Sequence, residues 1–286
     1  MADHVGFLAV DIGGTKLATA IVAHSGAVVA RSQAPTPKID VWATLSSLIS
    51  QQLSSAPIAV SSVGVGCGGP MELSGEHVSP LNIPDWRNFP LRKRLSELTQ
   101  LPVFIANDAQ AIVLGEAWCG AAQGRSDVLG MVVSTGVGGG ILSRGNLVVG
   151  RLGNAGHIGH INVQPDGRLC ACGARGCLEA YASGPSIASI TGAPAEAASP
   201  ETILATGRYV GRAIASAAAM LDFDLVVIGG SVALGFGEPF FAAVQQEVEQ
   251  SARLDFIRGV QVKPVGLGAE SPLVGAAAVA RMATIV

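Results

Sequence analysis

Three cysteines and a histidine carry the clearest chemistry in this sequence. Cys170, Cys172 and Cys177 stand within eight residues, and nine residues separate the first of them from His160. Three thiolates and one imidazole form the donor set of a closed tetrahedral zinc site, in which no position is left open for catalysis. We therefore predict a structural Zn²⁺ bound by these four residues. His157 stands three residues before His160 and is the alternative histidine ligand.

Two glycine-rich turns are candidates for phosphate binding. One follows an apolar run that ends at Asp11, and the other, STGVGGG at 134–140, joins two apolar runs. Successive backbone N–H groups without side chains form anion-binding concavities, and neighbouring hydroxyls add donors. Either turn alone would more often be an ordinary hairpin. Asp11 favours phosphate, because an acidic residue beside such a turn is a candidate Mg²⁺ ligand, directly or through water.

Two further acidic residues are candidates for proton transfer or substrate binding. Asp108 follows a short buried strand and Asn107, and ligands of open α/β sheets bind beyond the carboxyl ends of strands. The alternative is that Asp108 caps the helix that begins there, a position that aspartate favours. Glu179 comes two residues after Cys177, and its alternative is a solvated helix position.

The elements that must position these residues alternate between strand and helix. Residues 7–22 and 128–142 each predict a hairpin around a glycine turn, so the second half weakly repeats the first. Such alternation predicts an α/β fold. Further strands are predicted at 58–65, 103–106, 225–228 and 260–265, and helices at 42–53, 91–98, 108–118, about 200–221, 240–248 and 273–283.

Composition excludes several classes of protein. Hydrophobic residues make up 49% of the 286 residues and charged residues 14%, which excludes disorder and suggests a shared interface. The net charge of −3 offers no basic surface for nucleic acid or anionic lipid. No run of about 20 apolar residues and no secretory signal occurs. We expect a cytoplasmic homodimer with no nucleic-acid or membrane partner.

Two nucleotide-binding motifs are excluded by their context. Gly64-x-Gly66-x-x-Gly69 has the spacing of a dinucleotide fingerprint, but Pro70 follows where a helix N-terminus is required. In GGTK the lysine follows the threonine, so a Walker A loop is missing.

Taken together, the motifs resemble those of the ROK family of sugar kinases. They are DIGGTK at 11–16, IANDAQA at 105–111, STGVGGG at 134–140, and AGHIGH at 155–160 with CACGARGCLEAYASG at 170–184. The resemblance extends from residue 7 to the C-terminus. It implies an α/β fold of two actin-like, ribonuclease-H-like domains with an interdomain cleft that holds sugar and ATP. We place these domains at 1–115 and 116–286, with the final helix a candidate to pack on the first.

The resemblance also assigns roles to individual residues. It implies an ATP- and Mg²⁺-dependent transfer to a hexose hydroxyl, usually the 6-hydroxyl, with Asp108 as the catalytic base. The implied sugar contacts are Gly68, Asn82, Asn107, Asp108, His157, His160 and Glu179, with His160 binding zinc through its other ring nitrogen. The implied phosphate, Mg²⁺ and adenosine contacts are Asp11, Gly13, Gly14, Thr15, Lys16, Thr135, Gly136, Val137, Gly138, Gly139 and Gly230.

His157 bears on which sugar is phosphorylated. Many ROK glucokinases carry glutamate at the matching position, where it accepts hydrogen bonds from the sugar. An imidazole can also donate and is less demanding of a free 2-hydroxyl. AGHIGH, VSTGVGGG and GGSV resemble the kinases of this family that act on N-acetylmannosamine, which we therefore predict as substrate. Glucose is the alternative, because PLNIPDW and PDGRLCACG suit a glucokinase equally well.

A sugar-responsive transcriptional regulator is the remote alternative within the same family. It would need a helix-turn-helix module and a basic face. The first predicted strand begins by residue 7 and the net charge is negative, so we expect a kinase instead.

Overall fold

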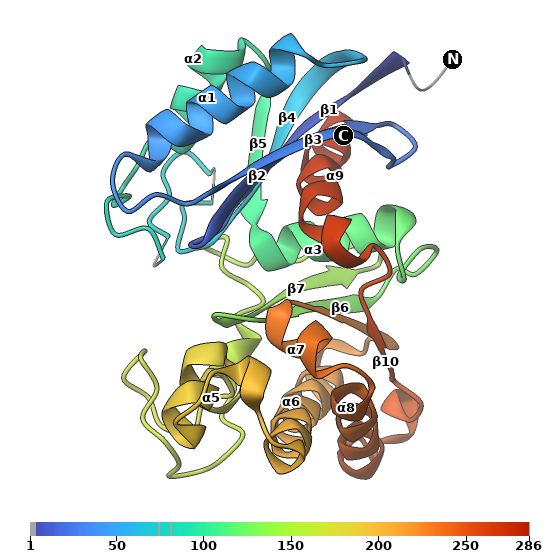
Figure 1. Cartoon of the computed structure of the whole chain (residues 1–286). Helices are drawn as coiled ribbons and strands as arrows, with labels where there is room; N and C mark the ends of the chain where they lie inside the picture. The colour runs from blue at the N-terminus through green and yellow to red at the C-terminus, as the bar shows by residue number, and fades with distance from the viewer. Residues whose placement is uncertain (1–3, 74, 81, 286) are drawn as a thin grey trace. The chain divides into compact units, whose positions relative to one another are not determined.

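Two five-stranded sheets, each in its own compact unit, organise the described part of the chain (Figure 1). The structure, a computed structural model, describes residues 4–73, 75–80 and 82–285. One unit contains the described residues up to Gln123, Val149–Ala155 and those from Ala269 onward. The other contains Gly124–Val148 and Gly156–Gly268. The chain divides at 123/124, whereas the boundary expected at 115/116 falls inside helix α3 (Asp108–Cys119).

The first sheet gathers three strand ends that matter for the site. Its order is β3-β2-β1-β4-β5, in which β1 is antiparallel to β2 and parallel to β4, and β4 is parallel to β5. The carboxyl ends of β1, β4 and β5 therefore lie at one edge. The strands are β1 (Val5–Ile12), β2 (Lys16–Ala23), β3 (Val28–Pro35), β4 (Ala59–Cys67) and β5 (Val103–Asn107).

Helices cover both faces of this sheet. Side chains of a strand point alternately to its two sides, so successive residues of β1 enter two different cores. Leu8 and Val10 belong to a core with helices α1 (Val41–Ser54) and α2 (Leu91–Thr99). Phe7 and Ala9 pack instead with helix α9 (Ser271–Ile285). Figure 1 shows α1 and α2 on one side of the sheet and α9 on the other. The near-continuous apolar sequence of β1 follows from this double burial.

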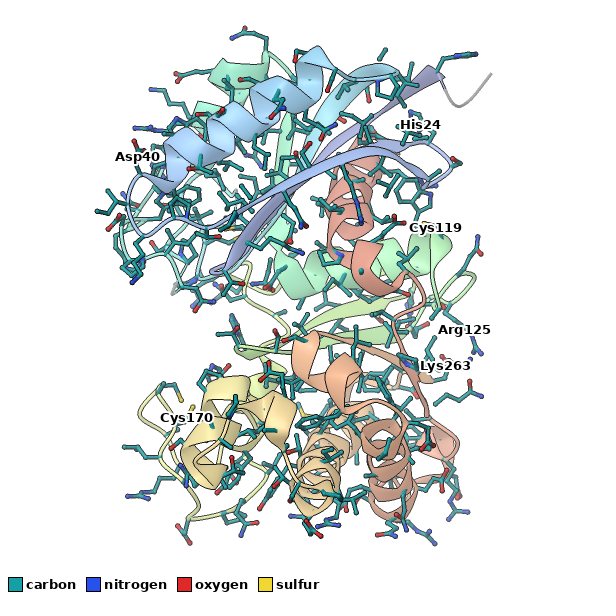
Figure 2. All side chains as sticks on the ribbon, in the orientation of Figure 1. His24, Asp40, Cys119, Arg125, Cys170 and Lys263 are labelled. Carbon is teal, nitrogen blue, oxygen red and sulfur yellow. The ribbon has the colours of Figure 1, made fainter. Side chains whose placement is uncertain are left out.

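Local signals explain where α1 begins. Asp40 stands directly before it (Figure 2), and its carboxylate accepts a 3.2 Å hydrogen bond from the Ala43 N–H, as a helix cap does.

Strand β3 has no counterpart among the predicted elements. Its side chains alternate between half-buried and exposed positions, so it offers no apolar run to recognise.

The second sheet repeats the first. Its order, β10-β9-β6-β7-β8, again consists of an antiparallel three-strand meander extended by two parallel strands. The internal repeat and the α/β class expected from the sequence are therefore present. The strands are β6 (Val128–Val133), β7 (Val137–Ser143), β8 (Asn146–Leu147), β9 (Leu225–Gly229) and β10 (Gln261–Pro264).

Helices α6 (Pro200–Leu221) and α8 (Glu238–Ser251) share the core of the second unit with its sheet. They approach closely, because a Cβ on Gly207 would stand 2.7 Å from the Ala243 Cβ, closer than real Cβ contacts come. The remaining helices and turns are α4 (Glu179–Ala182), α5 (Gly184–Thr191), α7 (Ser231–Phe236), η2 (Ile158–His160), η3 (Ala195–Ala197), η4 (Asp255–Ile257) and η5 (Gly268–Glu270).

Helix α9 contacts α3 and β4 backbone to backbone. A Cβ on Gly115 would stand 2.7 Å from the Gly275 nitrogen, and one on Gly64 would stand 1.9 Å from the Ala276 carbonyl oxygen. Glycine is required at these positions by the approach of another backbone.

No helix among the described residues has the length and hydropathy needed to cross a bilayer.

Candidate active site

Three parallel strands of the first unit deliver Asp11, Cys67 and Asn107 to one edge of their sheet. Cys67 pairs with Asn107 across β4 and β5, and Asp11 pairs with Gly66 across β1 and β4. Ligands bind at this edge in open α/β sheets. The position that the sequence assigned to a working carboxylate is therefore built as expected.

Asp108 stands at this edge in the first turn of α3. Asn107 is the helix cap, since its side chain accepts from the Ala109 N–H at 3.1 Å and its own N–H donates to Oε1 of Gln110 at 3.4 Å. The alternative that Asp108 itself is the cap is thus wrong. Its Oδ1 accepts a 2.8 Å hydrogen bond from the Ala109 N–H. The positive end of the helix dipole favours a negative charge here.

Asp11 and Asp108 influence each other electrostatically. The pKa of Asp11 is raised from 3.8 to about 7, mainly by burial and also by the charge of Asp108, while Lys16 acts in the opposite direction. Burial followed by the charges of Asp108 and Asp11 raises the pKa of the Cys67 thiol, which therefore stays protonated. Two carboxylates that disfavour each other's charge form a suitable environment for a divalent cation.

The raised pKa of Asp11 gives a testable pH dependence. Between about pH 4 and pH 7 the folded protein keeps a proton on Asp11 that the unfolded chain has released, so stability should fall as pH rises through this window. Asp11→Asn should remove that slope. Above pH 7, without Mg²⁺ or nucleotide, the variant should be more stable than wild type, with a free energy of unfolding on the order of 2–4 kcal/mol larger. Urea unfolding at pH 5, 6, 7 and 8 measures this. Parallel pH profiles for both proteins would contradict the prediction.

The first glycine turn contacts the segment that carries Asn82. The turn closes β1 onto β2 through the Gly13 N–H, which donates to the Lys16 carbonyl at 3.0 Å, and it leaves Thr15 and Lys16 exposed. A Cβ on Gly14 would stand 2.5 Å from the Asn82 Cβ, so only glycine fits. Gly68 lies near the same segment, since its Cβ would stand 3.9 Å from that of Pro80.

The second glycine turn is shorter than its sequence suggested. Strand β7 already begins at Val137, which pairs with Val133, so the turn itself is 134–136 and Gly138 and Gly139 are ladder residues. Predicting a turn through Gly140 was wrong, because glycine also occurs in strands where another backbone approaches. A Cβ on Gly139 would stand 3.0 Å from the Gly156 carbonyl oxygen.

Gly230 and Ser231, between β9 and α7, lie beside this second turn. Gly230 has a φ of 99°, and its Cβ would stand 2.3 Å from the Val133 carbonyl oxygen. The hydroxyls of Ser134 and Ser231 are 2.9 Å apart. The expected phosphate residues of the second unit and the expected adenosine-side residue are thus neighbours.

The four predicted metal ligands form one cluster. The ligand atoms of His160, Cys170, Cys172 and Cys177 all lie within 4.8 Å of one another. Figure 2 marks Cys170 in the region that precedes α4. The sulfurs of Cys172 and Cys177 are 3.7 Å apart, far beyond a disulfide bond. Tetrahedral Zn–S bonds of about 2.3 Å would separate two sulfurs by about 3.8 Å. The cluster therefore fits a zinc ion.

His160, not His157, completes this cluster. Nδ1 of His160 lies 3.8 Å from the Cys170 sulfur, whereas His157 is outside the ligand group found among the described residues. The two imidazole rings are 6.1 Å apart between centroids, and both side chains are exposed. With Nδ1 directed at the cysteines, Nε2 of His160 stays available for another partner.

Glu179 lies against the second glycine turn. Its Oε2 accepts a 2.9 Å hydrogen bond from the Val137 N–H. The alternative of a solvated helix position is wrong, because the side chain is partly buried and contacts this turn.

Gln110 is a residue of the site that the sequence analysis missed. It is buried, and besides accepting from Asn107 its Nε2 lies 3.4 Å from the Gly153 carbonyl and 3.3 Å from the Ala155 carbonyl. It thereby connects the Asp108 turn to the segment 149–155 that leads into His157. An Asn cap followed three residues later by Gln is the capping-box signal that could have revealed it.

Comparison with known proteins shows which family the chain belongs to. The model of the ROK family matches residues 7–283, nearly the whole chain. The chain belongs to the ROK family. An N-acetylmannosamine kinase of Escherichia fergusonii is 37% identical over 263 residues, which cover 85% of this chain and 88% of that protein.

Two solved ROK structures share the fold over almost their full length. The ROK hexokinase of Thermus thermophilus has a TM-score of 0.85 and 32% identity, covering 98% of this chain and 99% of that one. The ROK glucokinase of Streptomyces griseus, solved in complex with glucose and AMPPNP, has a TM-score of 0.82 and 31% identity, covering 96% and 99%. The actin-like α/β class implied by the motifs is thereby confirmed.

Proposed function

We propose that this protein is an ATP-dependent sugar kinase that phosphorylates the 6-hydroxyl of N-acetylmannosamine. The observation that carries the proposal is Asp108, held at the carboxyl edge of the first sheet by the Asn107 cap and electrostatically coupled to Asp11. Membership of the ROK family and 37% identity to an N-acetylmannosamine kinase support it.

Asp108 is the catalytic base of this proposal. Its carboxylate takes the proton from the sugar hydroxyl while that oxygen attacks the γ-phosphorus, and ADP carries away the bonding electron pair. Asn107 fixes the backbone of Asp108 through the cap, and its amide group lies beside Gly69, where it can reach a sugar hydroxyl. Phosphoryl transfer depends mainly on positioning and on neutralising charge.

The glycine turns and Asp11 are proposed to serve the nucleotide. Backbone N–H groups at Gly14, Thr15 and 135–137 are the proposed phosphate donors, and Gly230 is the proposed contact on the adenosine side. Asp11 would hold Mg²⁺, directly or through water, and the cation supplies charge neutralisation on the phosphates. Without the cation, Asp11 carries a proton below about pH 7. Mg²⁺ would have to displace this proton to bind there, so its affinity should fall as the pH drops below 7.

His160 and Glu179 are proposed to bind the sugar from the second unit. Zinc at the four-residue cluster would fix the His160 ring, so that its Nε2–H points at a sugar hydroxyl. Gly68 and Asn82 are proposed as sugar contacts of the first unit. The zinc would organise this loop without taking part in the chemistry, because the four donors close its coordination shell.

His157 is the proposed determinant of sugar choice. Its N–H can donate to an acetyl carbonyl of a 2-acetamido group, where a carboxylate would only repel that oxygen. His157→Glu should shift the ratio of kcat/KM from N-acetylmannosamine toward glucose by roughly ten- to a hundredfold. His24→Glu, at an exposed turn beyond the opposite end of β1, is the control and should leave the ratio unchanged.

A coupled ADP-release assay tests both the proposed function and its alternative. Wild type is given N-acetylmannosamine, glucose, N-acetylglucosamine, mannose and fructose in turn. The alternative is a glucokinase, which the Streptomyces griseus relative favours. Preference for glucose by tenfold or more would establish that alternative and end the His157 argument.

We also propose a cytoplasmic homodimer. None of the five cysteines forms a disulfide bond, which suits a reducing compartment. Exposed apolar side chains such as Met220, Leu254 and Phe256 are available to an interface between two copies.

A further inference from the structure

A carboxylate occupies part of the turn at which phosphate is expected. The Val137 N–H donates a 2.9 Å hydrogen bond to Oε2 of Glu179, and a Cβ on Gly136 would stand 3.1 Å from the same oxygen. The carboxylate thus lies against the last residue of the turn and the first residue of β7. Its negative charge is placed on a backbone donor in a concavity whose chemistry suits an anion.

The chain holds Glu179 in this place from both sides. Cys177, two residues earlier, belongs to the Cys₃His cluster. Five residues later, the Gly184 N–H donates to the Ser134 carbonyl at 2.8 Å, which ties the chain to the start of the turn. The backbone is therefore tied on both sides of Glu179, and rotation of the side chain is enough to move the carboxylate off Val137.

A phosphate group and this carboxylate compete for the turn. Both would accept from the Val137 N–H, and two like charges a few ångströms apart repel when they are partly shielded from water. We infer that Glu179 is a sugar-responsive gate of the phosphate turn. Without sugar its carboxylate weakens nucleotide binding, and a sugar hydroxyl that engages the carboxylate frees the turn. The inference rests on the proposed function, which makes Glu179 a sugar ligand and the turn a phosphate site.

Such a gate has a reciprocal consequence. If sugar strengthens nucleotide binding, nucleotide must strengthen sugar binding by the same factor. The gate would also limit the hydrolysis of ATP by water when no sugar is present.

Binding of Mg²⁺-AMPPNP to the full-length protein tests the gate. Isothermal titration calorimetry gives its Kd without sugar and with saturating N-acetylmannosamine. Without sugar, Glu179→Gln, which removes the charge, and Glu179→Ala, which also frees the donor, should each bind about tenfold tighter than wild type. Sugar should tighten binding to wild type and leave both variants unchanged.

Glu196→Gln, an exposed change in the same unit, is the control and should behave as wild type. Should Glu179→Ala fail to fold, Glu179→Gln decides alone. Unchanged sugar-free affinity in a folded variant, alongside sugar phosphorylation by wild type, would overturn the gate and leave the proposed function intact. Tighter binding by the variants, with no sugar phosphorylated by wild type, would uphold the charge effect at the turn and refute the proposed function.

Discussion

Asp108→Asn is expected to lower kcat by about 10² or more while sugar binding is largely retained. The asparagine side chain is nearly isosteric, and its oxygen can still accept from the Ala109 N–H as Oδ1 of Asp108 does. It cannot take up the proton of the sugar hydroxyl. Because the cap belongs to Asn107 and not to Asp108, the helix start should survive the change. Steady-state kinetics and sugar binding by calorimetry give the two readouts.

Asp40→Asn is a matched control for this prediction. It makes the same chemical change at the start of α1, an exposed helix terminus of the same unit, and should leave kcat unchanged. An unaltered kcat in Asp108→Asn would reject Asp108 as the base. A similar loss in both variants would indicate general damage to the unit instead.

Loss of one cluster ligand is expected to cost both stability and sugar affinity. Cys172 is exposed, so Cys172→Ser disturbs little packing, and its effects report on the metal. We expect zinc content to fall from about one equivalent per chain, and the free energy of unfolding to drop by about 3 kcal/mol or more, roughly 6–12 °C in Tm. Sugar affinity should fall with it, because the same loop carries His160 and Glu179.

Zinc analysis by mass spectrometry, thermal unfolding and sugar titration measure the three effects. Cys119→Ser, a cysteine outside the cluster, is the control and should keep the metal. A metal-free protein with wild-type stability and full activity would refute the prediction.

Local chemistry explains most of what the sequence predicted. The hairpin around Gly13 and Gly14 was recognisable because its turn residues interrupt two apolar runs that are buried on both faces. The metal cluster was recognisable because its ligands are close in sequence and thiolates have few other structural uses. In both cases neighbouring residues are sufficient to determine the structure.

What escaped prediction depends on contacts between distant residues. Glu179 and Val137 are 42 positions apart, and no property of either residue alone announces their hydrogen bond. The position of Gln110 against the carbonyls of Gly153 and Ala155 is equally non-local. Strand β3 was missed for another reason: at the edge of its sheet it is half exposed, and its alternating polar residues carry a weak signal.

The return of α9 to the first sheet has a consequence for biosynthesis. Phe7 and Ala9 of β1 share a core cluster with Leu273 and Ala276, so this apolar face is closed by a helix that is synthesised only after the whole second unit. At roughly 5–20 residues per second, a ribosome needs on the order of 10–30 s to proceed from β5 to α9. During that interval the nascent first unit exposes an apolar sheet face, whereas all segments of the second unit emerge before α9. The second unit can therefore complete its fold during synthesis, whereas the first unit can close its core only once α9 has emerged.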